Sequence, residues 1–213
     1  MFKEELIIIR HARSKHNVRD EEHLDAGITD WGERQSENVA QFLKEQMDLT
    51  GFSFISSPYY RCLLTGAPIE KHIDACNGFE VWPEFREYLN HSGRECLVSP
   101  RREEFPTLNY DRFDKEELFE SEHNEVFMNR IHDGFSLLPS KSLVLTHGLP
   151  ALSLIEIAKG SLHMPVWDYS VSNCSITYIK RGRIIWHGRS LYHERDYDND
   201  MYLRDYTVGN TIK

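Results

Sequence analysis

Short apolar runs punctuate the chain, and polar residues follow each of them. Residues 6–9 form a continuous run that is rich in β-branched side chains and bounded by charge, which predicts a strand buried on both faces. Similar runs at 52–55 and 143–145 predict two more strands. Residues 176–179 and 183–186 flank a Lys-Arg-Gly sequence and predict a final hairpin or a pair of edge strands.

Helical spacing separates these runs. Apolar residues recur every three or four positions from about residue 31 to residue 47, and Asp30 begins a candidate capping box. Ser57 and Pro58 fit the N-cap and first position of a second helix, and Pro150 opens a later one. Strands that alternate with helices predict a three-layer α/β/α fold, in which an open, mostly parallel sheet carries helices on both faces.

The periodicity fades between about residues 88 and 125. This segment is charged and contains prolines, but its aromatic residues favour packing over disorder. We therefore expect a single domain over residues 1–213, with an inserted cap of irregular structure at about 88–125 that covers the site. The acidic, tyrosine-rich stretch 195–206 predicts a terminal segment on the surface.

Composition narrows the possible partners. Of 213 residues, 40% are hydrophobic and 28% charged, which is typical of a packed globular protein. The formal net charge of −9 disfavours nucleic acid and anionic membranes as partners. The run 6–9 is too short for a signal segment or a membrane span, and the scattered cysteines are expected to be free thiols, so we expect a cytoplasmic protein. These totals predict no oligomeric state. The cysteines are Cys62, Cys76, Cys96 and Cys174.

Polar side chains follow three of the predicted strands. Arg10 and His11 come after the first, Arg61 begins the helix after the second, and His147 ends the late strand. Because ligands of open α/β sheets bind beyond the carboxyl ends of the strands, we expect these four residues to line one crevice.

This set of residue types suits phosphoryl transfer. The guanidinium groups of Arg10 and Arg61 can grip the phosphate oxygens and remove the repulsion that a dianion offers to a nucleophile. Neutral His11 has a lone pair that can attack phosphorus, and nearby arginines disfavour its protonated form. His147 can stabilise the equatorial oxygens in the transition state.

A carboxylic acid at the rim is also needed, to protonate the leaving oxygen and later to deprotonate water. Glu87 is the candidate from the residues alone, and Glu84 is its rival. Arginines and histidines already neutralise the phosphoryl group, so the scheme requires no metal and no cofactor.

Four motifs resemble the histidine phosphatase superfamily, in its phosphoglycerate mutase-like branch, and they occur in the same order. They are Ile-Arg-His-Ala-Arg-Ser-Lys-His-Asn at 9–17, Gly-Ile-Thr-Asp-Trp-Gly-Glu-Arg-Gln-Ser at 27–36, Ser-Ser-Pro-Tyr-Tyr-Arg-Cys-Leu-Leu-Thr at 56–65 and Thr-His-Gly at 146–148. In addition, Phe85-Arg86-Glu87 is similar to the Leu-Arg-Glu that presents the acid, which favours Glu87 over Glu84.

The resemblance implies a phosphate pocket and auxiliary ligands around it. The pocket residues are Arg10, His11, Arg61 and His147, and the auxiliary phosphate ligands are Ser14, Asn17 and Gly148. Two residues depart from the pattern, because Ala12 replaces the signature glycine and Arg13 replaces the glutamate common beside it. Alanine at position 12 would be strained if the backbone there had positive φ.

We predict a phosphomonoester hydrolase that works through a phosphohistidine intermediate on His11, without a metal ion. Its substrate is expected to be a small phosphorylated compound or a phosphoprotein. One alternative is a mutase of the phosphoglycerate type, which returns the phosphoryl group to its ligand. The other is a non-catalytic relative that binds phosphorylated ligands, for which Ala12 and Arg13 are the only support.

Overall fold

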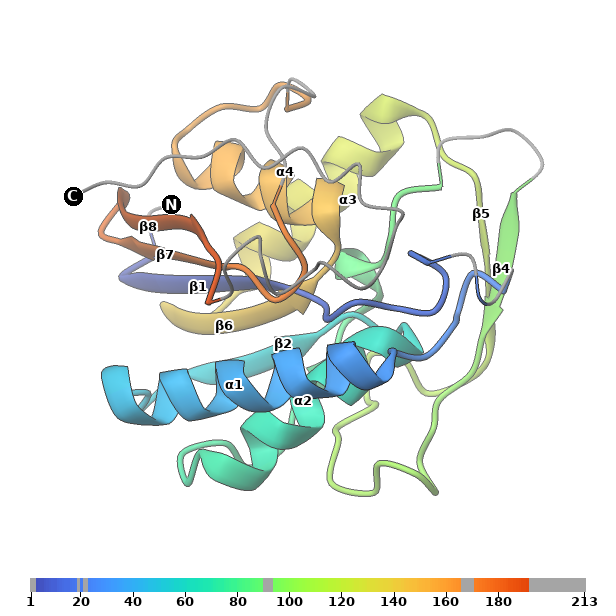
Figure 1. Ribbon diagram of the computed structural model, residues 1–213. Helices are drawn as coiled ribbons and strands as arrows, with labels where there is room; N and C mark the ends of the chain where they lie inside the picture. Colours follow the sequence, from blue (N-terminus) through green and yellow to red (C-terminus); the bar gives the residue numbers. More distant parts are fainter. Residues whose placement is uncertain (1–2, 19, 21–22, 90–93, 166–170, 192–213) are drawn as a thin grey trace.

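The computed structural model describes residues 3–18, 20, 23–89, 94–165 and 171–191, and Figure 1 shows its central sheet. The six strands of this sheet lie in the order β3-β2-β6-β1-β7-β8. Each apolar run predicted to form a strand overlaps one of them. The strands are β1 (Glu5–Arg10), β2 (Ser53–Ser56), β3 (Glu80–Val81), β6 (Lys141–Thr146), β7 (Ile176–Lys180) and β8 (Arg183–Arg189).

The sheet is mostly parallel, as predicted. Strands β3, β2, β6 and β1 run in one direction, and β7 pairs with β1 in the opposite direction. Strand β8 returns antiparallel to β7, which confirms the predicted hairpin. The two turn residues between β7 and β8 are Arg181 and Gly182, with φ of 48° and 74°. Positive φ at both positions is the I′ geometry that matches the twist of paired strands.

Helices cover both faces of the sheet, which confirms the three-layer prediction. Figure 1 shows α1 (Asp30–Gln46) and α2 (Tyr60–His72) below it, and α3 (Asn124–Leu137) and α4 (Gly148–Ala158) above it. Among the described residues, no helix combines the length and the apolar character needed to cross a membrane.

Alternation along the buried strands divides the core in two. Side chains of a strand point to opposite faces in turn. Ile7 and Ile9 of β1 therefore pack with the α1 and α2 layer, whereas Leu6 and Ile8 pack with α3 and α4. All four are buried, so the continuous apolar run reflects two covered faces.

Two helix starts differ from the predictions. The N-cap of α1 is Thr29, whose hydroxyl accepts from the amide of Gly32, and Asp30 is the first helical residue. Helix α2 begins at Tyr60 rather than at Pro58. The hydroxyl of Ser57 therefore does not cap this helix. It pairs instead with a histidine of the site described below.

The segment expected to be an irregular cap contains a small antiparallel sheet. Strands β4 (Glu95–Val98) and β5 (Glu117–Glu120) pair in it, so the prediction of irregular structure is wrong there. Phe119 of β5 stacks on Tyr59 at 6.1 Å between ring centroids, which joins this sheet to the start of α2. Residues 90–93 of this segment, and the stretch 195–206, lie outside the described residues.

Candidate active site

The carboxyl ends of the parallel strands bring the candidate residues to one edge of the sheet. Arg10, at the end of β1, is in register with Thr146, at the end of β6. The amide of His11 donates to the carbonyl of Thr146 over 2.9 Å. His147 follows directly and caps α4, while Arg61 lies in the first turn of α2. The backbone positions of the four residues predicted from strand ends therefore meet at this edge of the sheet.

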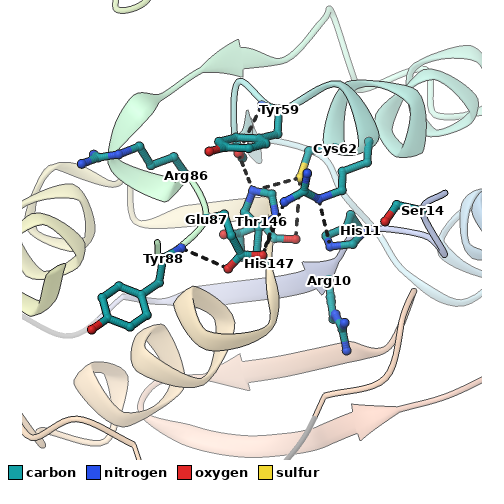
Figure 2. A network of polar contacts seen from close by, with 12 residues as sticks. Arg10, His11, Ser14, Tyr59, Cys62, Arg86, Glu87, Tyr88, Thr146 and His147 are labelled. Atoms are coloured by element: carbon teal, nitrogen blue, oxygen red, sulfur yellow. Dashed lines mark hydrogen bonds and ion pairs between the residues drawn. The ribbon is translucent and has the colours of Figure 1, made fainter. Parts of the chain in front are cut away.

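The imidazoles of His11 and His147 lie side by side. Their ring centroids are 5.1 Å apart and their planes meet at 61°. Both residues are buried, at 2% and 0% exposure. Figure 2 shows Glu87 beside His147, with Cys62 and Tyr59 above them in this view. The two histidines that the sequence predicts to share one ligand are thus close enough to do so.

Two fixed partners define the tautomer of His11. Its Nδ1 lies 2.7 Å from the carbonyl oxygen of Ala12, which can only accept, so Nδ1 carries the hydrogen. Its Nε2 accepts from Nε of Arg61 over 3.3 Å, and a guanidinium can only donate. Nε2 therefore bears the lone pair, and it is the nucleophilic atom of the ring.

His147 is oriented from the other side. Its Nε2 lies 2.7 Å from Oγ of Ser57, and its Nδ1 lies 3.3 Å from Oε2 of Glu87. With Oε2 of Glu87 as the acceptor, the matching tautomer has Nδ1–H towards Glu87 and Nε2 accepting from the Ser57 hydroxyl. The Nδ1–H is then the donor on the side of Glu87.

The structure separates Glu87 from its rival. Glu87 contacts Nη2 of Arg61 at 3.4 Å and Nδ1 of His147 at 3.3 Å. Glu84 instead pairs with Arg112, away from both histidines. Of the two carboxylates that the residues left open, Glu87 is the one beside the imidazoles.

Arg61 connects the parts of the site. Besides His11 and Glu87, its guanidinium donates to the carbonyl of Leu24 over 2.6 Å and lies over the ring of Tyr59. Its exposure is only 4%, so this cation is held in place on several sides. A fixed, buried guanidinium next to a lone pair is suited to an anionic ligand.

Arg10 takes a different direction in this conformation. Its Nη1 donates to the carbonyl of Val171 over 2.6 Å, and Figure 2 shows its side chain pointing away from Glu87 and His147. A Cβ on Gly148 would lie 3.7 Å from Nε of Arg10. A side-chain carbon at position 148 would thus touch this guanidinium at an ordinary van der Waals distance.

Comparison with known proteins decides the family. The model of the histidine phosphatase superfamily (branch 1) matches residues 6–191. The chain belongs to this superfamily. A comparison with curated protein sequences gives no match.

Solved structures share the superfamily's fold. The product of an open reading frame of Mycobacterium tuberculosis is 20% identical, with a TM-score of 0.61, and the alignment covers 87% of this chain and 97% of that one. A candidate alpha-ribazole-5′-P phosphatase of Escherichia coli is 16% identical, with a TM-score of 0.58 and coverages of 83% and 89%. A mycobacterial glucosyl-3-phosphoglycerate phosphatase in complex with VO3 is 18% identical, with a TM-score of 0.56 and coverages of 82% and 92%.

The superfamily signature continues into a tight turn. Ser14 and Asn17 hold one another, because the amide of each donates to the other's side chain over 3.1 and 3.2 Å. Asn173 donates to Oδ1 of Asn17 over 3.3 Å and to the carbonyl of His11 over 2.9 Å. Sequence reasoning missed Asn173. It precedes β7, and the antiparallel direction of that strand is the signal that places its beginning at this edge.

The departures from the signature cause no strain. Among the described non-glycine residues, positive φ occurs at Cys174 and Arg181, so Ala12 lies in an ordinary region of the backbone. Arg13 is buried, with its amide donating to Gln35 and its carbonyl accepting from the amide of Thr29. Both residues are compatible with an intact loop.

Burial and positive charge keep both histidines neutral. Burial lowers the pKa of His11 well below its usual value, and the charges of Arg61 and Arg10 add to this effect. Burial likewise lowers the pKa of His147, and the positive charges of Arg61 and Arg10 add to this effect. Near neutral pH, therefore, the Nε2 lone pair of His11 is available for attack.

The same side chains could in principle ligate a metal ion. One ligand atom from each of His11, Glu87 and His147 lies within 4.8 Å of the others. However, Nε of Arg61 is 3.3 Å from His11 Nε2, and its Nη2 is 3.4 Å from Glu87. A fixed cation at two of the three ligands repels a second cation, so the set fits a phosphate better than a metal.

Acid should destabilise the folded protein through these histidines. Their folded pKa values lie well below the ordinary 6.5, so their contribution is fully present above pH 6.5 and is lost as the pH falls below it. Between roughly pH 6.5 and 5, each histidine should increase the slope of the unfolding free energy against pH by at most about 1.4 kcal/mol per pH unit. Urea unfolding of wild type and His11→Gln over this range measures it.

Exposed His132 offers the control for this measurement. His132→Gln should leave the slope unchanged, because this side chain is 47% exposed and lies outside the candidate site. Equal slopes for all three proteins would contradict the neutral state assigned to His11.

Proposed function

We propose that the protein is a phosphomonoester hydrolase that works through a phosphohistidine at Nε2 of His11, without a metal ion. The observation that carries the proposal is the contact between that lone-pair nitrogen and the guanidinium of Arg61, next to a second buried imidazole. Two structural neighbours named as phosphatases, for alpha-ribazole-5′-P and glucosyl-3-phosphoglycerate, add support.

In the first step, the Nε2 lone pair forms a bond to phosphorus and the bond from phosphorus to the ester oxygen breaks. The carboxylic acid form of Glu87 gives its proton to that oxygen, so an alcohol leaves. The phosphorylated ring is cationic, and its Nδ1–H still donates to the carbonyl of Ala12, 2.7 Å away in this structure. That contact stabilises the intermediate.

In the second step, the Glu87 carboxylate removes a proton from water as the water oxygen bonds to phosphorus. The N–P bond breaks, its electron pair returns to Nε2 of His11, and inorganic phosphate leaves. Glu87 is protonated again and the cycle closes.

Phosphate binding involves side chains from several elements. Arg61 needs only a small adjustment to contact the phosphoryl oxygens, while Arg10 must turn away from the carbonyl of Val171. His147 donates from Nδ1. Ser14, Asn17 and Gly148 are proposed as auxiliary ligands at the edge of the pocket, and Asn173 supports Asn17 from behind.

The substrate class is proposed as a small phosphorylated compound or a phosphoprotein in the cytoplasm. A mutase would share the phosphohistidine but return the phosphoryl group to its ligand, so phosphate release and phosphoglycerate isomerisation are assayed side by side. The non-catalytic alternative is based on Ala12 and Arg13, neither of which has positive φ, and phosphate binding without turnover of any phosphomonoester would favour it.

Trapping the intermediate tests the proposal. Wild-type protein mixed with a labelled phosphomonoester and quenched in the cold should carry label that is released by acid and stable to alkali, as expected of phosphohistidine. Turnover should also survive a chelator, because the guanidinium groups of Arg61 and Arg10 neutralise the charge of the phosphoryl group and the Nδ1–H of His147 donates to its oxygens. Turnover without trapped label, or loss of turnover with the chelator, would overturn the mechanism.

A further inference from the structure

A buried cluster of two arginines and one glutamate lies behind the segment that presents Glu87. Glu122 accepts from Nη2 of Arg86 over 3.2 Å and from Nε of Arg130 over 3.1 Å, and its second oxygen also contacts Arg130. The side-chain exposures are 5% for Glu122, 10% for Arg130 and 17% for Arg86. Arg130 belongs to α3, and Glu122 lies just before this helix.

Arg130 uses its remaining hydrogens on the backbone of the Glu87 segment. Its Nη1 donates to the carbonyl of Glu84 over 2.6 Å and to that of Arg86 over 3.3 Å. The carbonyl between them, of Phe85, accepts from the hydroxyl of Thr146 over 2.8 Å. Three successive carbonyls before Glu87 are therefore fixed, two by Arg130 and one by the residue that precedes His147.

The residue after Glu87 is also attached to α3. The ring of Tyr88 packs on Phe127 at 4.6 Å between centroids, and its hydroxyl donates to Asn124 over 2.5 Å. The amide of Tyr88 in turn donates to Oε1 of Glu87 over 3.0 Å. Helix α3 thus grips the chain on both sides of this carboxylate.

Stability alone does not account for the cluster. Two buried guanidiniums share one carboxylate, which leaves an excess positive charge, and apolar residues of similar volume commonly stabilise a fold as well as a buried ion pair does. The fork of Arg130, by contrast, supplies donors in a fixed plane to two carbonyls and a carboxylate at once. Such an arrangement fixes the position of the backbone that precedes Glu87.

We infer that Arg130 is a positioning residue, which holds the backbone so that the carboxyl group of Glu87 reaches the leaving oxygen. The inference rests on the proposed function, because it requires Glu87 to transfer the proton. A shift of this carboxyl group by about 1 Å weakens proton transfer while the nucleophile and the phosphate ligands stay in place.

Leaving groups of different basicity separate this role from a structural one. An alkyl phosphate releases a strongly basic alkoxide that needs the proton, whereas p-nitrophenyl phosphate releases a weakly basic phenolate that does not. The quantity compared is kcat/KM, because it reports only the steps up to transfer of the phosphoryl group to His11. Later deprotonation of water by Glu87 therefore does not affect the comparison.

Arg130→Met should lower kcat/KM by about 100-fold for the alkyl phosphate and by no more than about threefold for p-nitrophenyl phosphate. Methionine fills the volume of the side-chain stem, and the Arg86–Glu122 pair that remains is charge-balanced. Arg130→Lys keeps the charge but not the fork, so it should show the same selectivity more weakly. If the methionine variant does not fold, Arg130→Lys alone tests the role of Arg130.

Two comparisons complete the experiment. In a Glu87→Gln background, Arg130→Met should have no further effect on the alkyl phosphate, because the proton donor is already missing. Arg112→Met, which removes the partner of Glu84 on the surface, should leave both substrates near wild-type values. Thermal unfolding of each variant shows how much folded protein is assayed.

The possible results distinguish failure of the role inferred for Arg130 from failure of the proposed function. Equal losses on both substrates, no loss on either, or an undiminished effect in the Glu87→Gln background would overturn the role of Arg130 and leave the proposed function intact. If Glu87→Gln itself affects both substrates alike, the assignment of Glu87 as the acid fails, and the inference fails with it.

Discussion

Replacement of His11 by alanine should reduce turnover of phosphomonoesters by at least about 10⁴-fold, as removal of an enzyme's nucleophile generally does. No other described side chain offers a lone-pair nitrogen held towards Arg61, so none can take over the attack. Steady-state release of inorganic phosphate measures the loss, and the label trapped in wild type should be absent from the variant.

Binding and folding need to be separated from chemistry in this variant. Arg61 and His147 remain, so His11→Ala should still bind inorganic phosphate, which isothermal titration calorimetry can detect. His132→Ala, an exposed histidine on α3, should turn over like wild type. Persistent turnover and label in His11→Ala would show that another residue receives the phosphoryl group.

The central part of this site could be predicted because parallel strands place their carboxyl ends together. The central residues of β1 and β6 form continuous apolar runs. Such runs indicate burial on both faces and so a position inside the sheet. From that position, the residues after each strand must meet. This is why the proximity of His11 and His147 follows from sequence reasoning.

The choice between Glu84 and Glu87 needed local backbone geometry. Three residues apart, the two would share one face of a continuous helix. The 3₁₀ helix η1 (Pro83–Phe85) ends just before Arg86, which is extended with φ of −64° and ψ of 164°. The chain therefore turns Glu87 towards the imidazoles while Glu84 stays with Arg112. The residues alone made Glu87 the candidate with Glu84 as its rival, and the family resemblance also favoured Glu87.

The sheet of β4 and β5 escaped prediction because its outer face breaks the usual alternation. Cys96 and Val98 point inward, but Leu97 and Leu118 lie outward at 49% and 50% exposure. With apolar residues on both sides, a short strand has no period-two signal. Charged residues before and after it add to the appearance of a loop.

Ser57 shows how one signal can have two interpretations. A serine before a proline is typical of a helix start. Here the helix begins later, at Tyr60, and the hydroxyl orients His147. The pairing joins residues 90 positions apart in the chain, and no local pattern reports contacts of that kind.

Arg61→Ala is expected to lower kcat/KM by about 10³-fold, the scale at which an arginine stabilises a phosphoryl-transfer transition state. The substitution removes the donor to His11 Nε2 and the contact with Glu87, so it weakens phosphate binding and frees the nucleophile from its fixed orientation. Arg61→Lys should recover little of this loss, because an ammonium group cannot contact two partners in one plane.

The controls for Arg61 follow from its burial. Because it is 4% exposed and lies over Tyr59, its removal also affects stability, so activity is normalised to folded protein from thermal unfolding. Exposed Arg102, changed to alanine, should keep wild-type kinetics. Phosphate inhibition should weaken in parallel with kcat/KM if Arg61 binds the phosphoryl group. A loss of stability with unchanged phosphate inhibition would instead make Arg61 a structural cation.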